Sequence, residues 1–360
     1  MKHSAGFSKQ ILCASLIAIA CGSFLNSALP SFALAEPEKM DIGTHRFLIE
    51  KLESVLELTP KGDTTRVPAL LRLADLYSEE ARLLHMTEIE KGCQDNPKAG
   101  GCGVSNSNRQ AAIKYYEMAM RESSGASQSR ILFQLAYLYE VNGDTKKASA
   151  LYKKILSMGP KHFSKIVLGQ SEAGLGEIAF KQKRFKEAKA AYERALKNDE
   201  TPRRGWIEYR IAWAELNLGK AEDGKRRLIR VLKTPALLTL ESTNGAKQDS
   251  SFQEDIAHDL TVFYARTGFS AQDIETLWQF SPEHARKGIL IELAEEAERL
   301  GLRRAAIAVW ATIASCPIDK KRLENRERIE AQTRVATLRF GLGEKAEAVR
   351  RVRKLARKKM

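Results

Sequence analysis

Two cysteines, Cys93 and Cys102, stand nine positions apart in the polar stretch KGCQDNPKAGGCGV, residues 91–104. Three kinds of chemistry fit two nearby thiols: a metal site, a reactive redox pair or a disulfide. A structural zinc site needs four ligands, and only His85 is near in the sequence. A redox pair usually has the C-x-x-C spacing, which this stretch lacks. The choice therefore depends on the compartment in which the protein resides.

The first 35 residues have the pattern of a secretory signal peptide. Lys2 and Lys9 precede the apolar run ILCASLIAIACGSFL, and the stretch SFALA has alanines at positions 33 and 35. A basic start, a short apolar core and an A-x-A site predict cleavage after Ala35. The polar stretch NSALPS, residues 26–31, interrupts the run before the ~20 residues that a membrane span requires.

Two alternatives to a cleaved signal stay open. The apolar run could be retained as an anchor, or Cys21 could be the lipid-modified residue of a lipoprotein. A bacterial lipobox usually has Leu or a similar residue three positions before its cysteine, where this chain has Ala18. We therefore expect export to the periplasm of a Gram-negative bacterium, with the protein soluble or peripherally associated with the envelope.

Export would leave Cys93 and Cys102 in an oxidising compartment, where two close cysteines in a loop are expected to form a disulfide. Closing this ten-residue loop contributes about 2.5–3 kcal/mol in the chain-entropy model. We expect no metal and no cofactor.

Catalytic chemistry has little support in the sequence. The five histidines after residue 35 are scattered and stand near no plausible nucleophile or metal cluster. The stretch GKAEDGKR, residues 219–226, nearly matches a phosphate-binding loop, but Arg226 replaces the required Ser or Thr. We expect a protein without enzymatic activity.

Composition predicts an all-helical chain. Removal of residues 1–35 takes away two lysines and no acidic residue, which lowers the net charge from +14 to +12. The remaining residues, about 325 in number, suffice for one or two domains. Ala, Leu, Lys, Arg and Glu dominate, and these residue types favour helices.

Residues 129–160, SRILFQLAYLYEVNGDTKKASALYKKILSMGP, contain a regular succession of small, aromatic and turn residues. Alanines allow two antiparallel helices to approach closely, tyrosines fill the space between pairs, glycine forms the turn and proline ends the second helix. The markers are Ala136, Tyr139, Gly143, Ala148, Tyr152 and Pro160.

Six further segments between residues 67 and 360 repeat this spacing in part. Turn glycines recur at Gly219, Gly268, Gly301 and Gly343, while Gly224 stands where alanine is usual. The series resembles the tetratricopeptide repeat. This resemblance implies an all-α, right-handed helical solenoid of about seven helix-pair units, whose first helices line a concave groove.

The expected organisation has five parts. Residues 1–35 form the signal peptide and residues 36–60 a capping helix. Residues 61–233 form a repeat array with an insert at 86–106, closed by the disulfide. A linker at 234–252 separates this array from a second array at 253–360, which has a basic end.

Family membership implies binding of a partner protein in the groove. In such repeats, positions two, five, nine and twelve of the first helix face inward. In the unit that begins at Ser129, these positions select Arg130, Phe133, Tyr137 and Glu140. In the next unit they select Gln170, Glu177 and Phe180.

The third unit contains GWIEYRIAW, which places Trp206, Tyr209 and Trp213 on one helix face beside Arg210. Aromatic residues next to an arginine are typical of a protein-binding hot spot. An aromatic stripe at helical spacing is also typical of a core, so the sequence leaves both interpretations open.

The chain ends with RRVRKLARKKM, which has no acidic residue. Its basic residues are Arg350, Arg351, Arg353, Lys354, Arg357, Lys358 and Lys359. They could tether the protein to an anionic membrane or an acidic envelope polymer, or they could form a solvated helix end. We expect no nucleic-acid partner, since an exported protein does not meet the chromosome.

A narrower resemblance concerns the pathway. The segment ALLRLADLYSEEAR resembles the opening repeat of tetratricopeptide proteins that accompany envelope-spanning motility and secretion machines in Gram-negative bacteria. The resemblance implies a role as an adaptor in such a complex, with a structural tether as the alternative.

Overall fold

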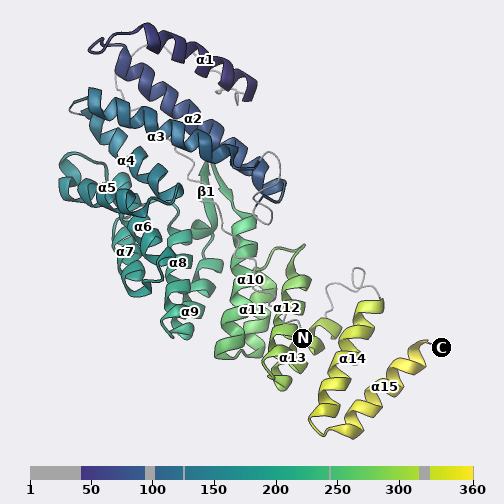
Figure 1. Ribbon diagram of the computed structural model, residues 1–360. Helices are drawn as coiled ribbons and strands as arrows, with labels where there is room; N and C mark the ends of the chain where they lie inside the picture. Colours follow the sequence, from purple (N-terminus) through teal and green to yellow (C-terminus); the bar gives the residue numbers. More distant parts are fainter. Residues whose placement is uncertain (1–41, 94–101, 125, 243–244, 316–324, 360) are drawn as a thin grey trace, which may run out of the picture.

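The computed structural model describes residues 42–93, 102–124, 126–242, 245–315 and 325–359. Almost all of them are helical (Figure 1). The α-helices are α1 Ile42–Leu58, α2 Arg66–Glu90, α3 Val104–Glu122, α4 Ala126–Val141, α5 Thr145–Met158, α6 Lys165–Lys181, α7 Phe185–Lys197, α8 Arg204–Asn217, α9 Ala221–Leu232, α10 Ser250–Thr267, α11 Ala271–Phe280, α12 Arg286–Arg299, α13 Arg303–Ser315, α14 Asn325–Gly341 and α15 Lys345–Lys359.

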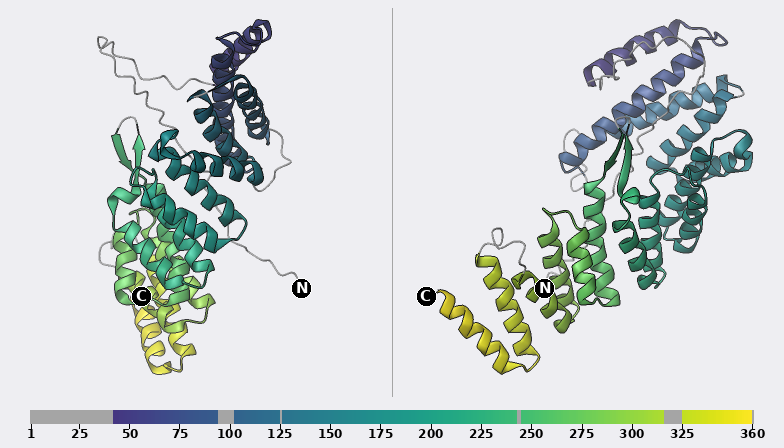
Figure 2. Two further views of the ribbon diagram at one scale, coloured as in Figure 1. Left: turned by 90° about the vertical axis from the view of Figure 1, so that its left-hand side faces the viewer. Right: turned by 180° about the vertical axis from the view of Figure 1, so that it is seen from behind.

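Helices α2 to α15 follow one another as seven successive two-helix units. In six of these units the two helices pack on each other, whereas α10 packs mainly on α9 and α12, and α11 packs mainly on α12. Helix α1 packs on α2. The result is an elongated, curved stack with α1 and α15 at opposite ends (Figure 2). The predicted all-α solenoid of helix pairs is therefore confirmed. In the described part of the chain, no helix is long and apolar enough to cross a membrane.

The turns within the pairs depend on left-handed backbone positions. The predicted turn glycines, Gly143, Gly219, Gly268, Gly301 and Gly343, all have φ between +73° and +85°. Glycine adopts this conformation without the steric cost that a Cβ atom imposes. The pair α6–α7 has no glycine there, and Lys183 takes the position with φ of +59°.

Small residues lie where helices cross, as the repeat pattern predicts. Ala136 of α4 and Ala148 of α5 are fully buried, and Tyr152 fills the space toward the next pair. Gly224 has a specific reason to replace alanine. A Cβ atom there would lie 2.5 Å from the Phe263 ring and 2.7 Å from the Ala212 carbonyl oxygen.

The loop between α2 and α3 is shorter than the predicted insert, because both helices extend into it. Cys93 and Cys102 lie at its two ends with their Cα atoms 5.6 Å apart, a separation that a disulfide can span. Glu88 near the end of α2 accepts a hydrogen bond from the Ser105 backbone N–H at 3.0 Å, at the start of α3. These contacts hold the ends of the two long helices together.

The segment 234–252 contains structure that the sequence analysis did not predict. A short 3₁₀ helix, η2 Pro235–Leu238, leads into strands β1 Thr239–Ser242 and β2 Gly245–Gln248. The strands pair antiparallel, with Thr239 opposite Gln248. Leu238 is buried in a hydrophobic cluster that continues from α8 to α14, so side-chain packing continues across this segment.

Candidate functional site

The predicted binding residues lie on the first helices of three successive pairs, α4, α6 and α8. On α4, Arg130 is exposed, and its Nη2 lies 2.9 Å from Asp75 Oδ2 on α2. Phe133 is half-buried, with its ring centroid 6.4 Å from that of Tyr152. The structure therefore connects α4 to the pair before it through Arg130 and to its own second helix through Phe133.

Tyr137 is half-buried near arginines from three other elements. Burial, together with the negative charge of Glu140, raises the pKa of Tyr137 to about 12. The charges of Arg109 on α3, Arg203 before α8 and Arg82 on α2 oppose this increase. Charges from α2, α3 and the segment before α8 thus act on this one phenol.

Glu140 lies inside the stack, although its repeat position predicted a place on the open face. Its carboxylate accepts a hydrogen bond from the Tyr152 hydroxyl at 2.9 Å and lies 3.7 Å from the Lys181 ammonium. Burial raises the pKa of Glu140 to about 7, and the Lys181 charge opposes that increase. We therefore assign Glu140 to the contact between two pairs.

Glu177 occupies the equivalent place one pair later and is also buried. It accepts hydrogen bonds from Arg210 Nε at 2.6 Å and Nη2 at 3.1 Å, and a third from the Tyr192 hydroxyl. A two-pronged arginine contact of this kind fixes both position and orientation. Glu177 thereby holds Arg210 in place.

The fixed Arg210 is part of a row of alternating rings and guanidinium groups, which we term the aromatic–arginine cluster: Phe180, Arg210, Trp206 and Arg203. The guanidinium carbon of Arg210 lies 3.8 Å from the Phe180 ring centroid and 5.7 Å from the Trp206 ring. The guanidinium carbon of Arg203 lies 5.6 Å from the centroid of the same Trp206 ring. All four side chains are half-buried, so each keeps some surface exposed.

Tyr209 and Trp213 point to the following pair. The Tyr209 hydroxyl and the Trp213 indole N–H both donate to Asp259 Oδ2 on α10, at 2.6 and 2.9 Å. Their rings pack edge-on against Phe252 and Phe263. Burial raises the pKa of Asp259, and these two hydrogen bonds partly offset that increase. Trp206 and the Tyr209–Trp213 pair thus contact different neighbours, although all three share one helix face.

One arrangement recurs four times along the stack. A carboxylate on a first helix accepts a hydrogen bond from an aromatic side chain of its own second helix and pairs with a cation from the first helix of the next pair. We call these sites the carboxylate bridges. They are Asp75 with Tyr116 and Arg130, Glu140 with Tyr152 and Lys181, Glu177 with Tyr192 and Arg210, and Glu298 with Trp310 and Arg334.

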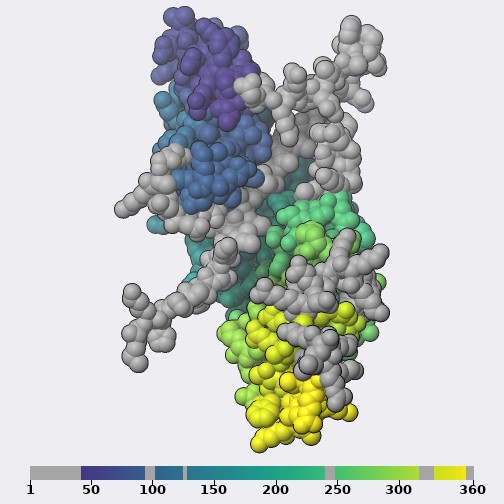
Figure 3. Space-filling model, turned by 90° about the vertical axis from the view of Figure 1, so that its right-hand side faces the viewer, coloured from purple at the N-terminus to yellow at the C-terminus, as the bar shows by residue number. Residues whose placement is uncertain are grey.

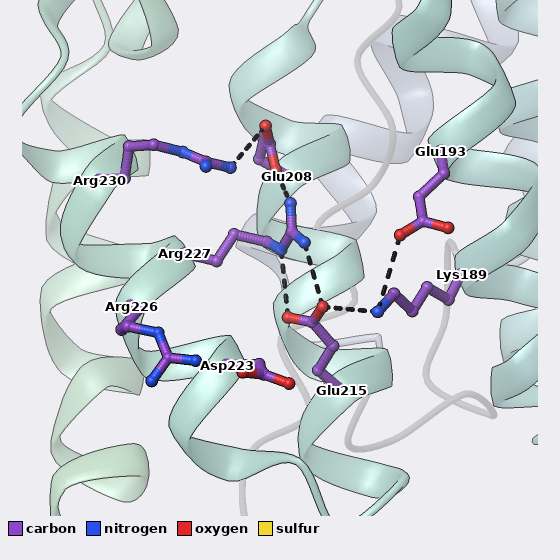
Figure 4. Close-up of polar contacts among 8 residues, drawn as sticks. All are labelled: Lys189, Glu193, Glu208, Glu215, Asp223, Arg226, Arg227 and Arg230. Carbon is purple, nitrogen blue, oxygen red and sulfur yellow. Dashed lines mark hydrogen bonds and ion pairs between the residues drawn. The ribbon is translucent and has the colours of Figure 1, made fainter.

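A second polar network, for which the sequence offered no prediction, lies between α7, α8 and α9 (Figure 4). Arg227 donates to Glu215 at 3.0 and 3.1 Å and also contacts Glu208. Lys189 of α7 lies 2.8 Å from the same Glu215. Glu215 is almost fully buried, so its charge is balanced by cations from both flanking second helices. This network fixes the helix that carries Trp206 and Arg210.

The basic end is helical in the described structure up to Lys359. Arg351 Nε lies 3.1 Å from Glu347 Oε1, and Arg350 pairs with the same carboxylate. Arg353 is exposed. The side chains of Lys354, Arg357, Lys358 and Lys359 lie outside the described part of the structure.

Known proteins match this chain at the level of the repeat. Models of the tetratricopeptide repeat match residues 129–162 and 173–202, which contain α5, α7, most of α4 and the second half of α6. No curated protein matches the chain. In the described residues, no group of histidine, cysteine and carboxylate side chains could hold a metal ion.

Solved structures that resemble the chain share little sequence with it. A tetratricopeptide repeat protein from Parabacteroides merdae is 15% identical, with a TM-score of 0.44, over 82% of this chain and 93% of that one. The C-terminal part of a repeat protein from Cytophaga hutchinsonii is 13% identical, with a TM-score of 0.41, over 86% and 99%. Pseudomonas aeruginosa PilF is 16% identical, with a TM-score of 0.37, over 72% and 98%.

The helix pairs, their turn glycines and the matched repeats define a class of protein, the helical repeat scaffold. Within that class, residues 129–162 and 173–202 match the tetratricopeptide repeat, and helices on both sides of these residues continue the same stack. Proteins with this repeat are scaffolds for protein–protein interaction.

Proposed function

We propose that the chain captures a segment of a partner protein on the face formed by α4, α6 and α8. The observation that carries this proposal is the aromatic–arginine cluster. Glu177 holds Arg210 through an ion pair, and the Tyr192 ring packs edge-on against Trp206. Both Arg210 and Trp206 retain exposed surface. Ordered aromatic and arginine side chains are typical of interaction hot spots, because little conformational entropy is lost on binding.

Trp206 offers the sharpest test of this proposal. Tyr209 and Trp213 are poor choices, because their removal would leave Asp259 without its hydrogen-bond donors. A Trp206→Ala variant keeps every carboxylate bridge. Chemical cross-linking in intact cells, followed by affinity purification, should recover a partner with the wild-type chain and lose it with the variant.

Ile166→Ala on α6 is the control, because Ile166 is an apolar residue with exposed surface that lies outside the cluster. Circular dichroism should show that both variants remain helical. Equal recovery of the partner by wild type and Trp206→Ala would argue against binding at the cluster.

We further propose that the protein works outside the cytoplasm, in a periplasmic envelope complex of the motility or secretion kind. The signal-peptide pattern at residues 1–35 and the proximity of Cys93 to Cys102 support this proposal. Mass spectrometry of unreduced protein from cells should find a chain that begins at Glu36 with these two cysteines linked. Free thiols at Cys93 and Cys102 would count against export.

A tether remains the second candidate function, because exposed Arg350 and Arg353 lie on the outermost helix. In this case the protein should sediment with vesicles of anionic lipid, and high salt should release it. The double variant Arg350→Gln and Arg353→Gln should bind these vesicles more weakly. Recovery of envelope lipid or polymer with no protein partner would favour the tether over the scaffold.

A further inference from the structure

The side chain of Tyr192 on α7 contacts residues of α6 and α8, in the middle of the stack (Figures 1 and 3). Its ring lies against the α6 backbone at Gly176, where a Cβ atom would be 2.6 Å from two of the ring carbons. Carbon atoms in contact are normally about 3.5–4.0 Å apart. Tyr192 is fully buried, so its ring occupies this position only because Gly176 has no side chain.

Glycine at this position is not a requirement of the helix pair. The unit that begins at Ser129 has Ala136 and Tyr152 at the same spacing of sixteen positions as Gly176 and Tyr192. Ala136 and Tyr152 are both buried in their pair, so an alanine and a tyrosine fit together there. Glycine in a helix interior is less favourable than alanine. Gly176 therefore allows Tyr192 to approach α6 more closely than the repeat demands.

From this position Tyr192 contacts three residues of the candidate site. Its hydroxyl donates a hydrogen bond to Glu177 and accepts one from Arg210 Nε at 3.4 Å. Its ring packs edge-on against Trp206, with the two centroids 6.4 Å apart. Burial and the Glu177 charge raise the pKa of Tyr192, while the Arg210 charge opposes that increase. The hydroxyl therefore keeps its proton and remains a donor.

We propose that Gly176 is a positioning residue of the aromatic–arginine cluster and acts through Tyr192. The Tyr192 hydroxyl orients Glu177, which holds Arg210, and the Tyr192 ring supports Trp206. A side chain at position 176 would displace the ring and thereby shift both members of the cluster without being listed among their contacts. The assignment rests on the proposed function, because only a surface that binds a partner requires these side chains to be placed accurately.

Gly174, two positions earlier on α6, provides a matched control. A Cβ atom there would lie 2.5 Å from the ring of Tyr152 on α5. Tyr152 donates to Glu140 and packs near Phe133, so it belongs to a different carboxylate bridge. Gly174→Ala and Gly176→Ala therefore add the same methyl group to the same helix, each against a buried tyrosine ring. Both variants should remain helical and lose Tm to a similar extent.

The fluorine NMR resonance of Trp206 reports directly on the surroundings of its ring. All four tryptophans of the purified chain can be labelled with fluorotryptophan, and a Trp206→Phe variant identifies the Trp206 signal. Gly176→Ala should shift this resonance by more than its linewidth, whereas Gly174→Ala should leave it at the wild-type position. The signals of Trp278 and Trp310, on α11 and α13, should not move in either variant.

A Trp206 resonance that keeps its wild-type position in Gly176→Ala would overturn the proposal. So would an equal shift in both alanine variants, because that would indicate a general effect of strain in α6. If Gly176→Ala does not fold, Tyr192→Leu and Tyr152→Leu form a second matched pair, since each removes one buried ring. In that pair only Tyr192→Leu should shift the Trp206 resonance, and an equal shift or none would again overturn the proposal.

Recovery of the cross-linked partner from intact cells gives the functional readout. Gly176→Ala should recover about tenfold less partner than Gly174→Ala. Equal recovery by these two variants, with loss of the partner in Trp206→Ala, would overturn the positioning role and leave the proposed function intact. If Trp206→Ala retains the partner, the proposed function fails, while the fluorine resonance still decides whether Gly176 positions Trp206.

Discussion

The middle of the stack and its two ends use side chains in opposite ways. Between α4 and α9, acidic groups such as Glu140, Glu177 and Glu215 are inside the stack, and each is balanced by partners from neighbouring helices. At α1 and α15, apolar groups such as Phe47 and Val352 are outside. Buried polar groups must be hydrogen-bonded with accurate geometry, so they specify the relative orientation of neighbouring repeats. Exposed apolar groups can instead pack against another surface.

Removal of Arg210 from the middle of the stack should cause the largest loss of stability. Arg210→Met leaves the buried Glu177 carboxylate with only the Tyr192 hydroxyl. We expect a loss of about 3–5 kcal/mol in the free energy of unfolding, because an uncompensated charge stays buried. Urea denaturation measures it.

Arg230→Met is the matched control for Arg210. Arg230 is exposed and makes one ion pair with Glu208. The expected loss is about 0–1 kcal/mol, as for a surface ion pair. Similar losses in the two variants would mean that the buried bridge is no more important than a surface contact.

Gly224 tests the close packing in the middle. Gly224→Ala should cost about 1–3 kcal/mol, since its new methyl group meets Phe263 and the Ala212 carbonyl. Gly288→Ala on α12 is its control, because nothing lies within 4 Å of the added atom. That substitution should raise stability by about 0.5–1 kcal/mol. Thermal unfolding of the two variants should therefore shift in opposite directions.

The raised pKa of Glu140 predicts that the stability of the folded protein depends on pH. Its pKa of about 7 in the folded protein is raised above the ordinary value of 4.5, so the folded state holds the proton more tightly. The contribution of Glu140 to stability is therefore greatest below pH 4.5 and decreases as pH rises toward 7. One proton corresponds to a slope of at most about 1.4 kcal/mol per pH unit.

Comparison of wild type with Glu140→Gln isolates that slope from other titrations. Urea denaturation at several values between pH 5 and 8 should give a difference in stability that changes with pH. A constant difference across this range would contradict a raised pKa at Glu140.

The smallest effect on stability is expected at the ends. Val352→Ser should change the free energy of unfolding by less than about 0.5 kcal/mol, because the side chain is exposed. Calorimetry at low protein concentration measures it. A larger loss would mean that the outer face of α15 contributes to the fold of a single chain, which would weaken the contrast between middle and ends.

The repeat architecture could be predicted from local requirements. Gly143 and Gly219 are needed for left-handed turns, and Ala136 and Ala148 for close helix crossing, so short-range spacing identifies them. The carboxylate bridges could not be predicted in this way. Glu177 receives Arg210 from 33 positions away, and repeat position alone does not reveal that partner.

The sequence between strands β1 and β2 does contain a hairpin signal, although a linker was predicted there. Asn244 and Gly245 form a dipeptide typical of tight hairpin turns, but the break in the repeat spacing suggested a linker. Trp206, Tyr209 and Trp213 were ambiguous, because a shared helix face does not say which neighbour each ring contacts. Export and the identity of the partner are properties of the cell and are not determined by packing.

The carboxylate bridges also bear on how the chain folds. Glu140 and Glu177 each depend on a cation from the next pair, so a pair that has folded alone lacks half of its bridge. Independent folding of single repeats is therefore disfavoured, and cooperativity extends from one pair to the next. Among the described side chains, none of the four bridges includes a residue of α15, so fraying can begin at that helix without disturbing the middle.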